Sequence, residues 1–273
     1  MTPDEFQFFA DFLRKQSGIS IDIRKEYLVE ARIVPLAREM GLSNLSALVS
    51  TLRAGTNGTL GHQIVDRMTT NETSFFRDIR PFETLTQYVI PSLLEKHATE
   101  RELHIWSAAC SSGQEPYSIA MQLRESFPEL ADWTVKIIAT DLSDTALVRA
   151  REGSYSQLEV NRGLPSNLLK KYFTRSGVRW EIKKTIRDMV DFRQLNLIVP
   201  DSDFPSADVA FVRNVLIYFE RDLQRNVLAR LHDRMSIPSF LFLGGSETTV
   251  KIDERFEVID DLPRTGCYRV KEG

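Results

Sequence analysis

The chain has 273 residues, of which 42% are hydrophobic and 27% are charged, the composition of an ordinary globular protein. Its net charge of −3 leaves no basic excess for a nucleic-acid backbone, so we expect no nucleic-acid partner. No apolar run approaches the ~20 residues of a membrane helix, and the acidic start of the chain is unlike a signal peptide. We therefore predict a cytoplasmic protein without direct membrane insertion. Two cysteines, Cys110 and Cys267, and four histidines without ligand spacing predict no metal site.

The first quarter of the chain, residues 3–67, carries only helical patterns. Its first helix has Thr2 as a candidate N-cap and ends at Gly18, a residue that suits a helix C-terminus. The second helix contains Pro35, which predicts a kink or a new helix start. A third helical segment follows, with a serine as its candidate cap. These patterns predict a small all-α domain over residues 1–70.

After residue 100, short apolar strands alternate with helical segments, which predicts an α/β fold with a mostly parallel sheet covered on both faces. The predicted strands are 102–109, 133–143, 207–219 and 239–247, with two more inside 256–270 at an antiparallel edge. Residues 153–194 contain short alternating pieces such as "RWEIKKTI" and "DMVDFRQL", which predict an inserted small antiparallel β-subdomain.

Small residues follow the first predicted strand, where doubly wound, Rossmann-like folds bind their ligands. The run from Ala108 to Gly113 lets a backbone approach a ligand closely, but it lacks the G-x-G-x-x-G spacing of dinucleotide-binding folds. Glu115 follows at the start of the next helix. One interpretation is a favourable interaction with the helix dipole, and the functional interpretation is a carboxylate that holds a ligand ammonium group.

Asp141 ends the second predicted strand, where an acid commonly accepts hydrogen bonds from the hydroxyls of a ribose. The alternative is a helix N-cap, although Ser143 or Asp144 suits that position and leaves Asp141 free for a ligand. The site has one acid for a ribose and one acid for an amine, but it lacks a glycine-rich loop for phosphates. This combination favours S-adenosylmethionine over a nucleotide phosphate.

The third main strand ends in "FVRNVLIYF", which places Arg213 and Asn214 inside an apolar run and Tyr218 shortly after it. Buried Arg and Asn side chains must be hydrogen-bonded, either within the protein or to a ligand. The segment "FRQLNL" adds Asn196 and Leu197, which we interpret as the edge of an adenine site.

Four stretches resemble, in sequence and in order, the chemotaxis receptor glutamate methyltransferases of the CheR family: "MTTNETSFFRD", "WSAACSSGQEPYSIAM", "ATDLSDTALVRAREGSY" and "RNVLIYFERDLQ". The resemblance covers essentially the whole chain. It implies a helical domain (1–70), a linker and active-site segment (71–90) and a Rossmann-like methyltransferase domain (91–273). The implied reaction transfers a methyl group from S-adenosylmethionine to glutamate carboxylates on the cytoplasmic helices of chemoreceptors, giving glutamyl methyl esters and S-adenosylhomocysteine.

The resemblance also implies roles for individual residues. Arg77 and Tyr218 become catalytic, with Tyr218 near the transferred methyl group. The implied donor-binding residues are Asn71, Thr73, Arg77, Ala108, Glu115, Asp141, Asn196, Leu197, Arg213 and Asn214. A glutamate with a pKa of about 4.3 is already ionised at neutral pH, so transfer needs positioning and exclusion of water. Arg77 is suited to hold that anion, and Phe75 and Phe76 either shield it from water or belong to the core.

Two other functions fit the sequence, a methyltransferase for another acceptor and a donor-binding signalling module without catalysis. The basic residues Arg24, Lys25, Arg32 and Arg38 are candidates for contact with acidic receptor helices, and a solvated charged face is the alternative. The chain departs from the family in the turn of "FTRSGVRWEI", which is short and has only Gly177. We therefore do not expect the β-subdomain to bind a receptor tail strongly.

Overall fold

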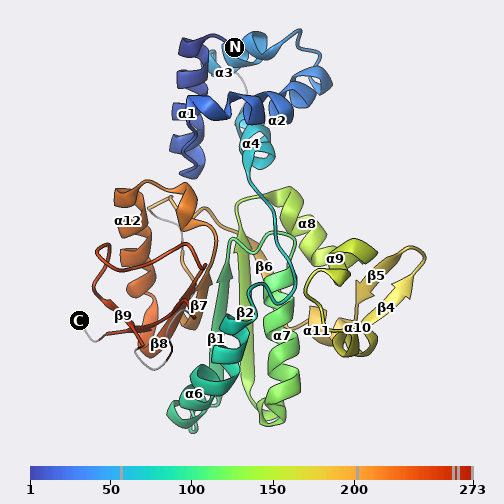
Figure 1. Cartoon of the computed structure of the whole chain (residues 1–273), viewed down its shortest axis with the longest axis vertical. Coiled ribbons are helices and arrows are strands. Elements are labelled where there is room, and N and C mark those ends of the chain that lie inside the picture. The colour runs from blue at the N-terminus through green and yellow to red at the C-terminus, as the bar shows by residue number, and fades with distance from the viewer. Residues whose placement is uncertain (56–57, 201–202, 260–261, 263–264, 272–273) are drawn as a thin grey trace.

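The structure is a computed structural model that describes residues 1–55, 58–200, 203–259, 262 and 265–271. A small helical unit, blue in Figure 1, is joined by an extended segment to a larger α/β unit with a central sheet. A second, smaller sheet projects from the side of the larger unit (Figure 1). No helix in the described part of the chain is long and apolar enough to cross a membrane.

The helical unit contains α1 (Pro3–Ser17), a 3-10 turn (Ile23–Lys25), α2 (Glu26–Glu39), α3 (Leu45–Arg53) and α4 (Gly58–Met68). The predicted ends of α1 are confirmed, because Thr2 and Glu5 form a capping box and Gly18 ends the helix with a φ of 75°. Pro35 lies inside α2 without ending it. The predicted serine cap of α3 is wrong, since Asn44 accepts the capping hydrogen bond. Apolar side chains from each helix form the core of the unit: Phe9, Leu13, Ile33, Leu48 and Ile64.

Among the described residues, the main sheet has seven strands in the order β6-β2-β1-β7-β8-β10-β9 (Figure 1). They are β1 (Glu102–Ala108), β2 (Thr134–Asp141), β6 (Val190–Gln194), β7 (Ala207–Val212), β8 (Met235–Leu243), β9 (Phe256–Val258) and β10 (Cys267–Val270). The five strands from β6 to β8 are parallel, whereas β10 runs antiparallel to β8 and β9. The predicted parallel sheet with an antiparallel edge is therefore confirmed.

Helices cover both faces of this sheet. In β1, Ile105 points into one apolar core and Trp106 into the other, as the two-residue period of a strand requires. The first face is covered by α5 (Arg80–Thr84), a π-helical turn (Leu85–Val89), α6 (Ile90–Lys96) and α7 (Gln114–Ser126), which a 3-10 helix (Pro128–Asp132) follows. On the second face lies α12 (Arg221–His232). Residues 80–90, which we assigned to the linker, thus form a helix packed on the sheet.

The insertion follows α8 (Asp144–Glu152) and contains the small antiparallel sheet that the sequence predicted. Its elements are β3 (Ser154–Ser156), α9 (Gln157–Asn161), α10 (Ser166–Tyr172), β4 (Phe173–Ser176), β5 (Arg179–Ile182) and α11 (Lys184–Arg187). The assignment of "DMVDFRQL" to this sheet is wrong, because β6 pairs in parallel with β2 in the main sheet. Alternating burial indicates a half-buried strand but does not indicate which sheet the strand joins.

Candidate active site

A cavity lies at the carboxyl ends of β1, β2, β6 and β7, the edge at which doubly wound folds bind ligands. It contains about 910 Å³ of empty space, including its open mouth. Its wall is built from the turns that follow these strands, from the segment before α5 and from the helical unit.

Asp141 ends β2 and lines the cavity, whereas the cap of α8 is Ser143. The two carboxylate oxygens of Asp141 accept hydrogen bonds from the backbone N–H groups of Ser111 and Ser143, both at 2.8 Å. Burial raises the pKa of Asp141 above its ordinary value, although these hydrogen bonds oppose the effect. The ionised carboxylate therefore lowers stability at neutral pH, and this loss is relieved as the pH falls through the raised pKa. A buried acid of this kind in a cavity wall is typical of a ligand-binding residue.

We predict that Asp141→Ala weakens the binding of S-adenosylmethionine and S-adenosylhomocysteine at least about tenfold, or ~1.4 kcal/mol, because the ribose hydroxyls lose their acceptor. Isothermal titration calorimetry measures the change. Asp144→Ala is the matched control, since Asp144 is an exposed acid in the first turn of α8. Unchanged donor affinity in a folded Asp141→Ala protein contradicts the ribose assignment.

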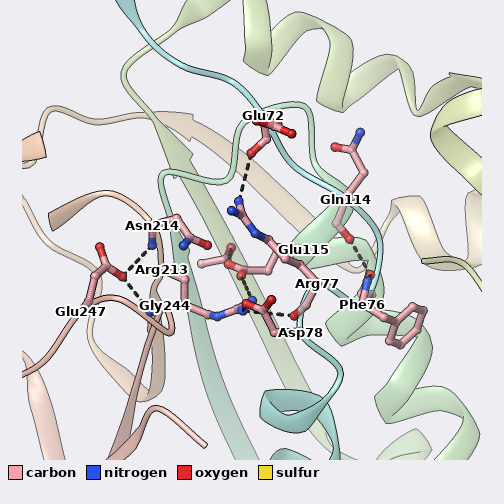
Figure 2. A network of polar contacts seen from close by, with 12 residues as sticks. Glu72, Phe76, Arg77, Asp78, Gln114, Glu115, Arg213, Asn214, Gly244 and Glu247 are labelled. Atoms are coloured by element: carbon pink, nitrogen blue, oxygen red, sulfur yellow. Dashed lines mark hydrogen bonds and ion pairs between the residues drawn. The ribbon is translucent and has the colours of Figure 1, made fainter. Parts of the chain in front are cut away.

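Arg213 follows β7, and only 1% of its side chain is exposed. One terminal nitrogen donates to Glu115 at 2.9 Å, and the other donates to Asp78 at 2.6 Å and to the carbonyl of Arg77 at 3.1 Å (Figure 2). Glu115 also accepts a hydrogen bond from the Ser107 hydroxyl at 2.8 Å. The acid predicted to hold an ammonium group is thus also an ion-pair partner. Because a carboxylate accepts about four hydrogen bonds, Glu115 retains capacity for a ligand.

The segment between α4 and α5 has a strained backbone beside the cavity. Phe76, Asp78 and Ile79 have positive φ values of 48°, 69° and 49°, which residues other than glycine rarely adopt. The Phe76 N–H donates to the Ser118 hydroxyl of α7 at 3.0 Å, which anchors the segment to the sheet unit. Such strain persists only where surrounding contacts impose it, and it is concentrated at functional sites.

Both predicted catalytic side chains present unpaired polar groups to the cavity. Arg77 donates through one terminal nitrogen to the carbonyl of Glu72 at 3.1 Å (Figure 2), and its other N–H groups have no partner among the described residues. The Tyr218 hydroxyl likewise contacts no polar group that the structure describes, while the Tyr218 carbonyl accepts a hydrogen bond from Ser20 N at 3.1 Å. Unpaired donors on a cavity wall are available to a ligand.

The helical unit supplies part of the cavity wall, which no sequence feature predicted. Ser17 and Ile19, at the end of α1, line the cavity together with Thr69. Arg32, a candidate for receptor contact, donates hydrogen bonds to the carbonyls of Met68 and Thr69 at 2.7 and 3.2 Å. Arg32 therefore fixes the segment that leads from α4 into the cavity.

The structure brings most of the predicted site residues to this one cavity. They are Asn71, Thr73, Arg77, Glu115, Asp141, Asn196, Leu197, Arg213, Asn214 and Tyr218. Ala108, also predicted to bind the donor, does not line the cavity: the residue is 1% exposed and packs in the second core with Trp106. Its neighbour Ala109, which leaves the strand with a φ of 52°, lines the cavity instead. Within the described ranges, no group of His, Cys, Asp and Glu side chains is placed to hold a metal ion.

Comparison with known proteins extends over nearly the whole chain. Residues 4–69 match the family model "CheR methyltransferase, all-alpha domain", and residues 71–263 match "CheR methyltransferase, SAM binding domain". "Chemotaxis protein methyltransferase 1" of Pseudomonas aeruginosa is 40% identical over 272 residues, which are 98% of either chain. "Chemotaxis protein methyltransferase Cher2" of Pseudomonas putida is 40% identical over 264 residues, which are 95% of either chain. Because the matches include both units of the structure, the chain belongs to the CheR methyltransferase family, with an all-α domain ahead of a domain that binds S-adenosylmethionine.

Proposed function

We propose that this protein is a cytoplasmic protein-glutamate O-methyltransferase that modifies chemoreceptors. The proposed acceptors are glutamate side chains on receptor cytoplasmic helices, and the proposed product is a glutamyl methyl ester. The observation that carries this proposal is the guanidinium of Arg77 on the cavity wall, which donates one hydrogen bond to the Glu72 carbonyl and whose other N–H groups have no partner among the described residues. Such a group is suited to an anionic acceptor. The names of the full-length relatives, which are chemotaxis protein methyltransferases, support a receptor as the partner.

The polar and apolar groups of the cavity fit S-adenosylmethionine. Asp141 offers carboxylate lone pairs for ribose hydroxyls, and Glu115 offers them for an ammonium group. Leu142 and Leu197 provide apolar wall for an adenine ring. When it is bound, S-adenosylmethionine supplies a methyl group on a positively charged sulfur.

A glutamate acceptor requires orientation rather than proton transfer. Its ordinary pKa of about 4.3 leaves it ionised at neutral pH, so the protein needs no general base for it. Arg77 holds the carboxylate by charge-assisted hydrogen bonds, which orients one oxygen for attack. Phe75 and Phe76 are buried in the core and do not line the cavity, so they anchor this segment rather than shield the methyl group. Exclusion of water from the methyl group falls to Tyr218.

We expect Arg77→Ala to reduce the single-turnover rate about 10- to 100-fold, since hydrogen bonds to a charged group contribute ~1.5–3 kcal/mol. Arg77→Lys should reduce the rate less than Arg77→Ala, because lysine keeps the charge although it lacks the planar guanidinium. Tyr218→Phe should be milder still, since the ring remains. Donor titration and thermal unfolding of the three variants distinguish a catalytic role from a structural role. In a structural role, activity follows the folded fraction. An Arg77→Ala protein that folds, binds donor and methylates at the wild-type rate overturns the assignment.

The reaction itself is tested by incubating the protein with methyl-labelled S-adenosylmethionine and a receptor cytoplasmic fragment. The proposal expects label on glutamates and its release as methanol in mild alkali, because esters hydrolyse there. Label on another residue type indicates a different acceptor. Donor binding by calorimetry without any transfer indicates the non-catalytic signalling module.

A further inference from the structure

The turn between β7 and α12 presents several residues to the cavity although most of it is neither helix nor strand. Asn214, Val215, Tyr218 and Phe219 all line the cavity, and only a short 3-10 helix (Leu216–Tyr218) is regular. Backbone N–H and C=O groups that lack a helix or sheet partner need other partners when they leave water. The position of the turn therefore depends on whichever side chains satisfy these groups.

Three N–H groups of this turn donate to Glu247, which follows β8. Figure 2 shows the bond from Asn214 and a further one from Gly244. One carboxylate oxygen accepts from Asn214 N and Gly244 N, both at 2.7 Å. The other oxygen accepts from Val215 N at 2.9 Å and from Ile217 N at 3.3 Å. One side chain thus satisfies four backbone donors, and it needs both oxygens to do so.

The carbonyl groups of the same turn have a separate partner. Gln224 of α12 donates through its amide nitrogen to the carbonyls of Leu216 and Phe219, at 2.9 and 3.0 Å. The turn is therefore held between a carboxylate on its donor side and an amide on its acceptor side. The carboxylate contacts the residues nearer Asn214, and the amide contacts those that flank Tyr218.

Close packing at Gly244 leaves no space for a side chain between the turn and Glu247. A Cβ atom added at Gly244 would lie 2.6 Å from the Asn214 side-chain nitrogen and 2.7 Å from a carboxylate oxygen of Glu247. Asn214 itself has a φ of 60°, a left-handed conformation that asparagine adopts more readily than most other residues with a Cβ atom. The hydrogen bond from Asn214 N to Glu247 and the tight contact with Gly244 hold it there.

We propose that Glu247 is a positioning residue for methyl transfer, which acts by holding Asn214 and Tyr218 at the wall of the donor cavity. Glu247 does not line the cavity itself, so it acts through the backbone of the turn. The role in positioning Tyr218 rests on the proposed function. The role in positioning Asn214 concerns donor binding and does not depend on which acceptor is methylated. A carboxylate is required rather than any polar side chain, because four N–H groups face its two oxygens.

The test compares Glu247→Gln and Glu247→Ala with Glu254→Gln, a matched change at an exposed carboxylate of the same C-terminal region. Glutamine has nearly the same shape but places an NH₂ group against one pair of N–H groups. We expect both Glu247 variants to weaken S-adenosylhomocysteine binding about tenfold in calorimetry, and Glu254→Gln to leave it unchanged. A Glu247→Gln protein with wild-type affinity and wild-type single-turnover rate overturns the proposal, since shape alone then suffices.

A second pair of variants keeps the test informative if the Glu247 variants fold poorly. Gly244→Ala crowds Asn214 and Glu247, whereas a Cβ at the adjacent Gly245 meets no atom within 4 Å. We expect Gly244→Ala alone to weaken donor binding, and equal affinities for the two alanine variants contradict the proposal. In an Asn214→Ala background, Glu247→Gln should lose most of its effect on donor affinity, because coupled residues are not additive. If the fold losses in donor affinity of the two single variants simply multiply in the double variant, the proposal is also overturned.

These measurements separate the positioning role from the proposed function. Donor titration requires no acceptor, so it reports on Glu247 even if the acceptor is not a receptor glutamate. Conversely, if the receptor fragment is methylated normally by Glu247→Gln, the proposed function stands and only the positioning role fails.

Discussion

Replacing Gly163 by alanine is expected to lower the methyl-transfer rate on the order of 100-fold, because it displaces the segment that carries Arg77. Gly163 lies in the insertion with a φ of 91°, and an added Cβ atom would lie 2.0 Å from the carbonyl oxygen of Phe75. Phe75 is fully buried, with its ring edge-on to Tyr155 and Phe173 at centroid distances of 5.0 and 5.7 Å. These contacts hold the ring in place, and we expect relief of the clash to displace the backbone two residues before Arg77.

Gly177→Ala is the matched control for this prediction. Gly177 lies in the same insertion with a φ of 58°, but an added Cβ atom meets nothing within 4 Å. Both variants therefore introduce left-handed strain, commonly ~1–2 kcal/mol per residue, and only Gly163→Ala adds the contact with Phe75. Methylation rates, donor titration and thermal unfolding are measured for both. Equal rates for the two folded variants show that the contact with Phe75 does not position Arg77.

Replacing Arg213 by methionine is expected to lower the free energy of unfolding by about 3–5 kcal/mol, the usual loss when one partner of a buried ion pair is removed. Methionine keeps apolar bulk, but it leaves Glu115, with 12% of its side chain exposed, without its charged partner. It also releases Asp78 and the carbonyl of Arg77, so donor binding should weaken as well. Urea unfolding with linear extrapolation measures the change.

Two further variants show whether burial is the cause. Arg149→Met removes an arginine that pairs with Glu159 at 2.8 Å with 49% of its side chain exposed, and it should cost less than about 1 kcal/mol. Arg213→Lys should fall between the two methionine variants, since one ammonium group cannot replace the planar fork that contacts both acids. If Arg213→Met lowers the free energy of unfolding no more than Arg149→Met does, the buried ion pairs of Arg213 do not stabilise the cavity wall.

The sequence alone determined the type of fold and the secondary structure of most segments, because those signals are local. The ends of α1 at Thr2 and Gly18 were predicted because helix caps depend on residues within a few positions of one another. The strand that ends at Asp141 is an apolar run that lies in the central sheet between helix-covered faces. An acid at such a strand end has few roles in a doubly wound fold, and for that reason the sequence indicated Asp141, which lines the cavity.

Assignments that depend on side-chain direction or on strand pairing were decided by the tertiary structure. Ala108 and Ala109 are chemically identical, and only the exit of the chain from β1 turns one into the core and the other toward the cavity. The alternating pattern of β6 fits either sheet, because a two-residue period records that one face is more buried and not which strand lies alongside.

The cavity itself was decided by contacts between segments far apart in the chain. Ser17 and Ile19 reach the cavity only because the helical unit packs against the ends of the strands. Glu247 is one acid in an ordinary turn until the fold brings the N–H groups of Asn214 and Val215 to its carboxylate. Local periodicity and capping arise from neighbours in sequence, whereas these contacts arise from close packing and from the need to satisfy every buried backbone group. No pattern within a short window of sequence contains that information.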